Sequence, residues 1–198
     1  IIIHAAANAA MTPSIVDKYR SQFEKATICI TEFALPMETC KYAMKVAKEY
    51  GATTIVNPAP YAEIPEDFYP YIDILTPNEM EAAQFCGFAV SDPTSAAAAC
   101  QWFHQKGVKN VVITMGHLGA FVSNGEKSLM IDSYHVNAID TSGAGDSFNG
   151  GLAYAYERGH DIFVSSRFGN AVASLCVQRR GTARSMPTFA EVEKVLKL

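Results

Sequence analysis

The chain has 198 residues and a formal net charge of −4, with 49% hydrophobic and 18% charged residues. This balance is typical of a soluble globular protein large enough for a sizeable core. Lysine and arginine form no cluster, and no apolar run approaches the roughly 20 residues that span a bilayer. We therefore expect neither nucleic acid nor a membrane as a partner. The five cysteines form no C-x-x-C pair, which indicates reduced thiols and a cytoplasmic protein.

The first residue is isoleucine rather than methionine, and the opening I-I-I-H has the pattern of a strand already under way. The opening residues contain neither the charged segment nor the cleavage site of a signal peptide. We interpret residues 1–198 as a single domain that is truncated at its N-terminus.

Apolar strand-like runs alternate with amphipathic segments along the chain. In chain order the pattern predicts a strand at 27–31, a helix at 36–50, strands at 53–56 and 72–75, a helix opened by Thr76-Pro77, a helix at 94–106, a strand at 110–114, a hairpin of 121–123 with 128–131, and helices at 147–157, 162–177 and 189–196. This alternation predicts an α/β fold with three layers, α/β/α, around a mostly parallel central sheet.

Ligands of such sheets bind outside the carboxyl ends of the strands. The segments that follow the predicted strands are therefore the places to look for chemistry. They are 57–60, 78–81, 114–116 and the glycine-rich stretch 140–151.

The stretch D-T-S-G-A-G-D-S-F-N-G-G at 140–151 stands at the start of a predicted helix. Gly143, Ala144 and Gly145 have little or no side chain, so their backbone N–H groups can converge on an anion. A carboxylate such as Asp146 would repel a bound phosphate, so it does not suit a site that only binds an anion. It does suit a site in which the carboxylate takes the proton from a hydroxyl that attacks the phosphorus. The alternative is that Asp146 caps the helix and the glycines permit a tight turn. The stretch matches neither a P-loop nor a dinucleotide-binding fingerprint.

The stretch also closely resembles the C-terminal signature of the ribokinase-like (PfkB) carbohydrate kinases. Five further segments look like the same family in order and spacing, and the resemblance covers essentially all of the chain. They are I-H-A-A-A-N-A-A at 3–10, V-N-P-A-P at 56–60, L-T-P-N-E-M-E at 75–81, V-I-T-M-G-H-L-G at 112–119 and V-Q-R-R-G-T-A-R-S-M-P at 177–187. The N-terminal strands, the lid and most sugar-binding residues of the family have no counterpart in these residues, so we expect a sheet with an unpaired edge.

The resemblance implies an ATP-dependent sugar kinase, with D-ribose and its 5-phosphate as the first substrate and product to consider. Fructose, nucleoside or ketodeoxysugar acceptors are alternatives within the family. A remnant that binds nucleotide without turnover is the alternative of another class. A homodimer is the expected assembly of a full-length protein of this family.

The resemblance also assigns roles to residues. Asp146 matches the catalytic base, and Gly143, Ala144 and Gly145 match the anion hole. Asn78 and Glu81 match a motif that organises Mg²⁺ and phosphate, although Glu81 alone has the pattern of a solvated carboxylate at a helix start. The positions that match nucleotide contacts are Thr114, Met115, Gly116, His117, Leu118, Gly119, Gly145 and Asn170.

A monovalent cation, K⁺, is expected beside the anion hole, held mostly by backbone carbonyls. The matching positions are Asp140, Ser142, Cys176, Arg179, Gly181 and Ser185.

One stretch departs from the family. The glutamate that contacts the sugar in ribokinases aligns with Ala34, and Glu32 stands where a glutamine is usual. Because Glu32 and Ala34 would point the same way along a strand, Glu32 is the candidate to reach the sugar. Otherwise the acceptor differs from ribose.

Overall fold

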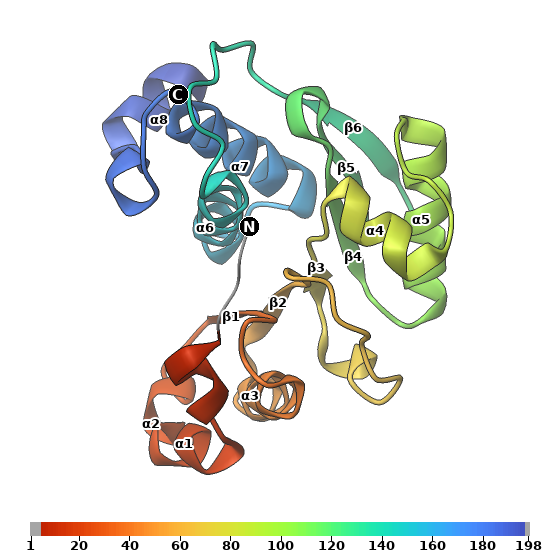
Figure 1. Cartoon of the computed structure of the whole chain (residues 1–198), viewed down its shortest axis with the longest axis vertical. Helices are drawn as coiled ribbons and strands as arrows, with labels where there is room; N and C mark the ends of the chain where they lie inside the picture. Colours follow the sequence, from red (N-terminus) through yellow and green to blue (C-terminus); the bar gives the residue numbers. More distant parts are fainter. Residues whose placement is uncertain (1–4, 197–198) are drawn as a thin grey trace.

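The computed structural model describes residues 5–196, so the strand predicted for I-I-I-H at 1–4 lies outside the described residues. Within this range six strands form one sheet in the order β1-β2-β3-β4-β5-β6 (Figure 1). The strands are β1 (Ile28–Glu32), β2 (Thr53–Asn57), β3 (Ile74–Leu75), β4 (Asn110–Thr114), β5 (Gly119–Ser123) and β6 (Ser128–Asp132). The helices are α1 (Pro13–Lys18), α2 (Arg20–Phe23), α3 (Met37–Glu49), α4 (Glu79–Cys86), α5 (Pro93–Gln105), α6 (Ala144–Glu157), α7 (Ile162–Cys176) and α8 (Phe189–Leu196), with 3-10 turns η1 (Ala6–Ala10), η2 (Tyr69–Tyr71), η3 (Gly116–Leu118) and η4 (Ala183–Ser185).

The sheet is mostly parallel, as the alternation predicts. β1 to β4 pair in parallel, whereas β5 and β6 form an antiparallel hairpin on the far side of β4. β1 lies at one edge of the sheet, and Ile30 on this strand is 45% exposed. An exposed apolar residue on an edge strand matches the unpaired edge expected from the sequence.

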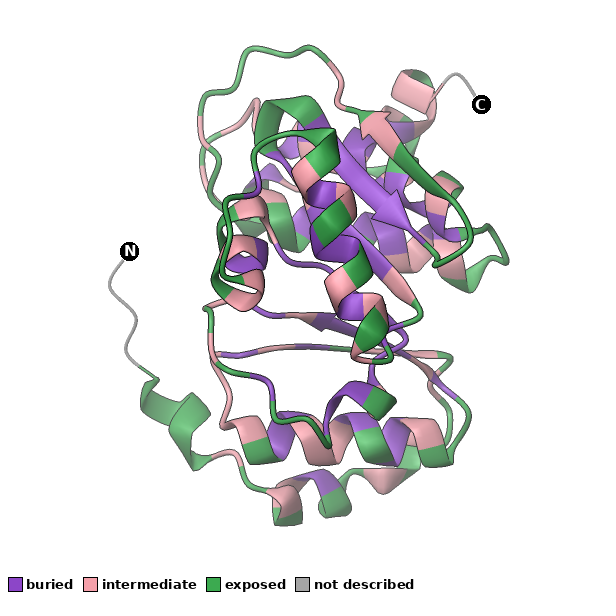
Figure 2. Ribbon diagram, turned by 90° about the vertical axis from the view of Figure 1, so that its right-hand side faces the viewer, coloured by how far each residue is buried: buried purple, intermediate pink, exposed green. Residues whose placement is uncertain are grey.

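Two hydrophobic clusters cover the two faces of the sheet. Val56 and Leu75 point to a cluster that includes residues of α3, α4 and α5, whereas their neighbours Ile55 and Ile74 point to a cluster with α6 and α7. Successive side chains of a strand point to opposite faces, so fully apolar strands need helices on both sides. Figure 2 shows the buried residues gathered along the central strands and the helix sides that face them. The predicted three-layer α/β/α fold is therefore confirmed.

The sequence pattern was wrong about the start of α4 and did not identify α1 and α2. Thr76-Pro77 does not open α4, because Asn78 is its N-cap and Glu81 completes a capping box. β3 is limited to Ile74–Leu75, shorter than the predicted 72–75, because a bend precedes it. The helices α1 and α2 have 6 and 4 residues, too few for a hydrophobic period to show. No helix within residues 5–196 is long and apolar enough to cross a bilayer.

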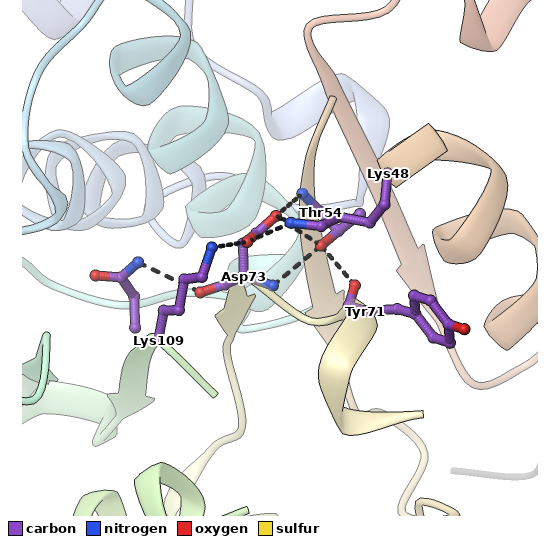
Figure 3. Close-up of polar contacts among 6 residues, drawn as sticks. Lys48, Thr54, Tyr71, Asp73 and Lys109 are labelled. Carbon is purple, nitrogen blue, oxygen red and sulfur yellow. Dashed lines mark hydrogen bonds and ion pairs between the residues drawn. The ribbon is translucent and has the colours of Figure 1, made fainter. Parts of the chain in front are cut away.

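A network around Asp73 joins elements at the amino ends of the strands (Figure 3). The Asp73 carboxylate accepts hydrogen bonds from the Lys48 ammonium at 2.7 and 2.8 Å and from the Thr54 backbone N–H at 3.1 Å. Lys109 lies 3.1 Å away on the other side. Burial would raise the pKa of Asp73, but Lys48, Thr54 and Lys109 together lower it below the ordinary value of 3.8. The carboxylate therefore ties α3, β2 and the start of β4 together in its ionised form.

We predict that Asp73→Asn lowers the free energy of unfolding at pH 7 by about 2 kcal/mol, because a buried charged acceptor is lost. The depressed pKa means that this stabilisation is present above the unfolded pKa and is lost as the pH falls below about 4. Urea titrations of both proteins between pH 7 and pH 3 measure the difference.

The matched control is Asp67→Asn, which removes an ion pair with Lys41 from a carboxylate that is 71% exposed. It should change stability by less than about 0.5 kcal/mol. A difference for Asp73→Asn that persists undiminished at pH 3 would contradict the ionised role of Asp73.

Candidate active site

Several of the predicted site residues lie at the carboxyl ends of the parallel strands. Glu32 at the end of β1 pairs in register with Asn57 at the end of β2. Beyond the end of β3, Asn78 forms a bridge with Thr114 at the end of β4. The first turn of α6 borders the same edge, because Asp146 lines a cavity with Glu32 and Asn57.

Asp146 stands in the first turn of α6 with a free carboxylate. The N-cap is Gly143, at φ 76°, and no side chain caps the helix. Asp146 is exposed, and its carboxylate accepts no hydrogen bond from any residue between 5 and 196. The alternative in which Asp146 only caps its own helix is therefore not what the structure shows.

Backbone donors beside this carboxylate are only partly free. The Ala144 N–H already donates to the Thr141 carbonyl at 3.1 Å. The N–H groups of Gly143, Gly145 and Asp146 meet no acceptor within the described part of the chain. A Cβ at Gly145 would find no atom within 4 Å, so a ligand has room there. The free backbone N–H groups at this turn are therefore those of Gly143, Gly145 and Asp146, whereas the Ala144 N–H is already engaged.

The cavity beside Asp146 has a volume of about 220 Å³. It is lined by Ile30, Thr31, Glu32, Asn57, Asp146, Asn149 and Gly150. Sequence reasoning named Asp146 and Glu32 and indicated the segment that begins with Asn57. It missed Asn149, which stands one helical turn after Asp146 and has no distinctive spacing of its own.

Glu32 reaches this cavity, although the geometry differs from the expectation. β1 ends at Glu32, and the chain turns before Ala34. The Glu32 carboxylate accepts a hydrogen bond from the Ala34 N–H at 2.8 Å. The two residues therefore do not point the same way along one strand, because the carboxylate itself closes the turn between them.

A second cavity, of about 360 Å³, lies on the other side of Ala144. Gly116, His117 and Asn170 line it, as does the loop at 133–138. Met115 is only 3% exposed and packs in the core, so its side chain does not face this cavity. The loop 133–138 has no helical or strand period, which explains why the sequence pattern did not indicate it.

The side-chain amide nitrogen of Asn170 is already hydrogen-bonded within the chain. Its Nδ2 donates to the carbonyls of Ile131 and Asp132 at 2.9 and 3.2 Å, and this contact holds the end of β6 against α7. The Tyr134 hydroxyl, from the loop that lines the same cavity, is buried without a hydrogen-bond partner in the described structure. A buried hydroxyl without a partner costs free energy.

Gly116 and Gly119 have different reasons to be glycine. Both have positive φ, 54° and 109°, but a Cβ at Gly116 would meet no atom within 4 Å. A Cβ at Gly119 would lie 2.1 Å from the Ile131 carbonyl oxygen. The close approach at Gly119 is therefore to the backbone of β6, and only Gly116 opens toward a ligand.

Asn78 and Glu81 form the capping box of α4. The Asn78 side chain accepts from the Glu81 N–H at 2.8 Å, and Oε2 of Glu81 accepts from the Asn78 N–H at 2.9 Å. Glu81 is only 8% exposed, so it is not the solvated carboxylate that its position alone indicated. Burial raises the pKa of Glu81, although the hydrogen bond from Asn78 acts in the opposite direction. A cation near this carboxylate would relieve the cost of its buried charge.

The predicted K⁺ residues gather where the 140–143 loop meets residues 176–185. The Asp140 carboxylate accepts from the N–H groups of Ser142 and Gly181, both at 3.0 Å, and these bonds lower the pKa of Asp140 to about 2. The Cys176 thiol lies 3.0 Å from the Ser185 hydroxyl. Arg179 turns its guanidinium to Glu191, so only its backbone can face the loop.

No cluster of three or more histidine, cysteine, aspartate or glutamate side chains suited to a metal exists within residues 5–196. A divalent ion held by side chains alone would need such a cluster.

A further cavity, of about 390 Å³, lies away from these residues between α6, α7 and α8. Its aromatic side chains, Tyr154, Phe168 and Phe189, pack against one another at centroid distances of 5.3 to 6.4 Å. It contains none of the predicted site residues, and we assign it to the packing of α8.

A model of the family described as pfkB family carbohydrate kinase matches residues 1–189. This chain belongs to the pfkB family of carbohydrate kinases. Ribokinase of Haemophilus influenzae is 35% identical over 197 residues, which cover 100% of this pfkB chain and 64% of that protein. Deoxyribokinase of Salmonella typhi is 29% identical over 199 residues, which cover 100% of this chain and 65% of that protein. The chain thus spans just under two thirds of the length of these curated relatives.

Solved structures agree with the family. The crystal structure of ribokinase from Thermotoga maritima superposes on this pfkB chain with a TM-score of 0.87 and 32% identity, covering 100% of this chain and 65% of that one. The structure of Arabidopsis thaliana ribokinase complexed with ribose and ATP gives a TM-score of 0.87 and 30% identity, covering 92% of this chain and 59% of that one. The fold is therefore ribokinase-like.

We predict that Gly119→Ala destabilises the chain by more than about 3 kcal/mol, because the added methyl group meets the β6 backbone. Gly125→Ala, in the same hairpin, is the control. Its φ is 87°, but its nearest neighbour lies 3.9 Å from the added Cβ. It should cost only the strain of positive φ, about 1 kcal/mol. Thermal unfolding compares the two variants, and equal losses would contradict the steric explanation.

Proposed function

We propose that this chain carries the nucleotide side and the catalytic base of an ATP-dependent sugar kinase, with D-ribose as the leading acceptor. The observation that carries the proposal is the free carboxylate of Asp146. It faces a cavity shared with Glu32 and stands beside unpaired backbone N–H groups at the start of α6. A base and an anion site at one point are what phosphoryl transfer to a hydroxyl requires.

The chemistry follows from this arrangement. Asp146 takes the proton of the sugar hydroxyl, and the oxygen then forms a bond to the γ-phosphorus as the bond to the ADP oxygen breaks. The N–H groups of Gly145 and Asp146, together with the positive end of the α6 dipole, stabilise the negative charge of the transferring group. Sugar phosphate and ADP are the products.

The second cavity is the proposed nucleotide site. It is mostly apolar, is bordered by Gly116 and His117, and reaches Ala144 beside the anion site. A nucleotide lying there would direct its phosphates toward Asp146. The Arabidopsis ribokinase of similar fold was solved with ribose and ATP, which supports ATP and a sugar as the two ligands of the proposal.

Two cations belong to the proposal. Asn78 and Glu81 are the residues that would hold hydrated Mg²⁺, which supplies charge neutralisation to the phosphates when bound. The loop of Asp140 and Ser142, with residues 176–185, would hold K⁺ through carbonyl oxygens. Both assignments rest on the donor chemistry of these residues and on the family pattern.

The relatives and the lining of the cavity beside Asp146 both bear on the choice of acceptor. The relatives include both ribokinases and deoxyribokinases, so the family likeness leaves the 2-hydroxyl open. The presence of Glu32 in the acceptor cavity favours a polyhydroxylated sugar over an apolar acceptor. A single domain, a cytoplasmic location and a homodimer of a longer protein complete the proposal.

We predict that Asp146→Asn lowers kcat for phosphoryl transfer by about 10³-fold, because the general base is lost. Binding of MgATP, measured by calorimetry, should remain. The assay uses ribose, deoxyribose, fructose and adenosine, with and without K⁺, on these 198 residues and on the longest natural chain that contains them.

Asp132→Asn is the matched control, since Asp132 is an exposed carboxylate at the end of β6 and does not line the acceptor cavity. It should keep kcat within about twofold of the wild type, because it leaves the base and the anion site intact. If the wild-type longer chain binds ATP but phosphorylates no acceptor, the kinase proposal fails and a nucleotide-binding module remains.

We predict that Glu32→Ala raises the KM for the sugar by about tenfold or more, because a charged hydrogen-bond acceptor is removed. The KM for ATP should not change. Adding Ala34→Glu to this variant places a carboxylate at the position usual in the family, and partial recovery would show that both positions reach the sugar. Glu38→Ala on the exposed start of α3 is the control. An unchanged KM for every sugar would exclude Glu32 from recognition.

A further inference from the structure

A buried amide on α6 joins this helix to the end of β3. Oδ1 of Asn149 accepts a hydrogen bond from the Thr76 hydroxyl at 2.7 Å, and Nδ2 of Asn149 donates to the Gly145 carbonyl at 3.0 Å. The two residues are 73 positions apart in sequence. Asn149 is 6% exposed and Thr76 is 2% exposed. Buried hydrogen bonds of this kind hold a single geometry, because a broken one leaves polar atoms without partners.

The Thr76 end of this contact is fixed to the sheet. The Thr76 N–H donates to the Val56 carbonyl at 2.9 Å, which continues the pairing of β2 with β3. The next residue, Pro77, accepts from the Thr114 N–H at 2.9 Å. Thr76 is therefore held by strands on both sides, immediately before the Asn78 cap of α4.

The Asn149 end of the contact lies in the first turns of α6. Asn149 follows Asp146 by three residues, so both side chains lie on one face of the helix and line the same cavity. Its amide contacts the carbonyl of Gly145, the residue directly before Asp146. Both polar atoms of the Asn149 amide are hydrogen-bonded within the chain. In the proposal, Asn149 therefore fixes the start of α6, and Asp146 and Glu32 contact the sugar.

We propose that the Thr76–Asn149 contact is a positioning device that sets the first turn of α6, with Asp146 and its free N–H groups, relative to the Asn78–Glu81 cap of α4. The inference rests on the proposed kinase function. The loop before α6 has no regular structure, and the N-cap Gly143 contributes no side-chain bond. The loop is tied to residues 177–181 through Asp140, and the contact with Thr76 ties the start of the helix to the sheet. A small displacement of a base from its reacting atom costs a large factor in rate.

The test is a set of threonine variants in the longest natural chain that contains these residues. Thr76→Val keeps the shape of the side chain and removes the hydroxyl, and Thr76→Ser restores the hydroxyl. Thr54→Val is the matched control, because Thr54 is a buried threonine of neighbouring β2 whose hydroxyl also donates at 2.7 Å, to the Tyr71 carbonyl. Thr54 stands at the opposite, amino end of the sheet, beside Asp73.

We expect Thr76→Val to lower kcat about tenfold or more while the KM for ATP stays within about twofold. Thr76→Ser should return kcat to near the wild-type value. Thr54→Val should lose thermal stability at least as strongly and keep kcat. This pattern separates positioning from stability, because a purely structural contact would lower stability in both valine variants and leave kcat per folded molecule unchanged.

Asn149→Ala and the double variant with Thr76→Val complete the set, and Asn149→Ala replaces the valine variant if the latter does not fold. If the pair acts as one unit, the double variant should lose little more kcat than either single variant. A wild-type kcat in Thr76→Val, or additive losses in the double variant, would overturn the positioning role and leave the kinase proposal intact. A wild-type chain that transfers phosphate to no acceptor would overturn both.

Discussion

Parallel pairing of β1 to β4 is the constraint on which the rest of the molecule depends. It brings the carboxyl ends of four strands to one edge, where Glu32, Asn57, Thr76 and Thr114 follow one another across the sheet. Side chains separated by more than 80 residues thereby share one surface. The start of α6 is the additional element at this edge, and it carries the carboxylate and the free N–H groups. The residues of the site are thus brought together by the order and direction of the strands, and no single motif contains them all.

Much of the fold could be predicted because its strands are buried on both faces. Short β-branched runs such as 53–56 and 110–114 have no other stable environment, and the glycine after α3 marks its end. The sequence was less informative where a side chain decides a boundary. α4 begins after Asn78 and not at Pro77, because the side chains of Asn78 and Glu81 form a capping box there.

The site shows the same division between pattern and geometry. Asp146 and its glycines were singled out because the stretch 140–151 resembles the family signature, whereas the spacing alone left a helix cap as the alternative. The sequence could not indicate that the Ala144 N–H donates to the Thr141 carbonyl, because every residue type has a backbone carbonyl. Nor could it indicate Asn149, whose role depends on a partner 73 residues away. In the same way, the turn closed by Glu32 became visible only from its hydrogen bond to the Ala34 N–H.

The Asp73 network lies at the opposite edge of the sheet from Asp146, and this separation has an evolutionary consequence. Substitutions around the cavity beside Asp146 leave the ion pairs of Lys48 and Lys109 untouched, so residues of this cavity can change without loss of this part of the chain's stability. Such a partition makes a scaffold evolvable. This separation is one physical reason why a single fold can serve kinases for more than one sugar. Residues such as Glu32 can be substituted while the Asp73 network at the amino ends keeps the strands in register.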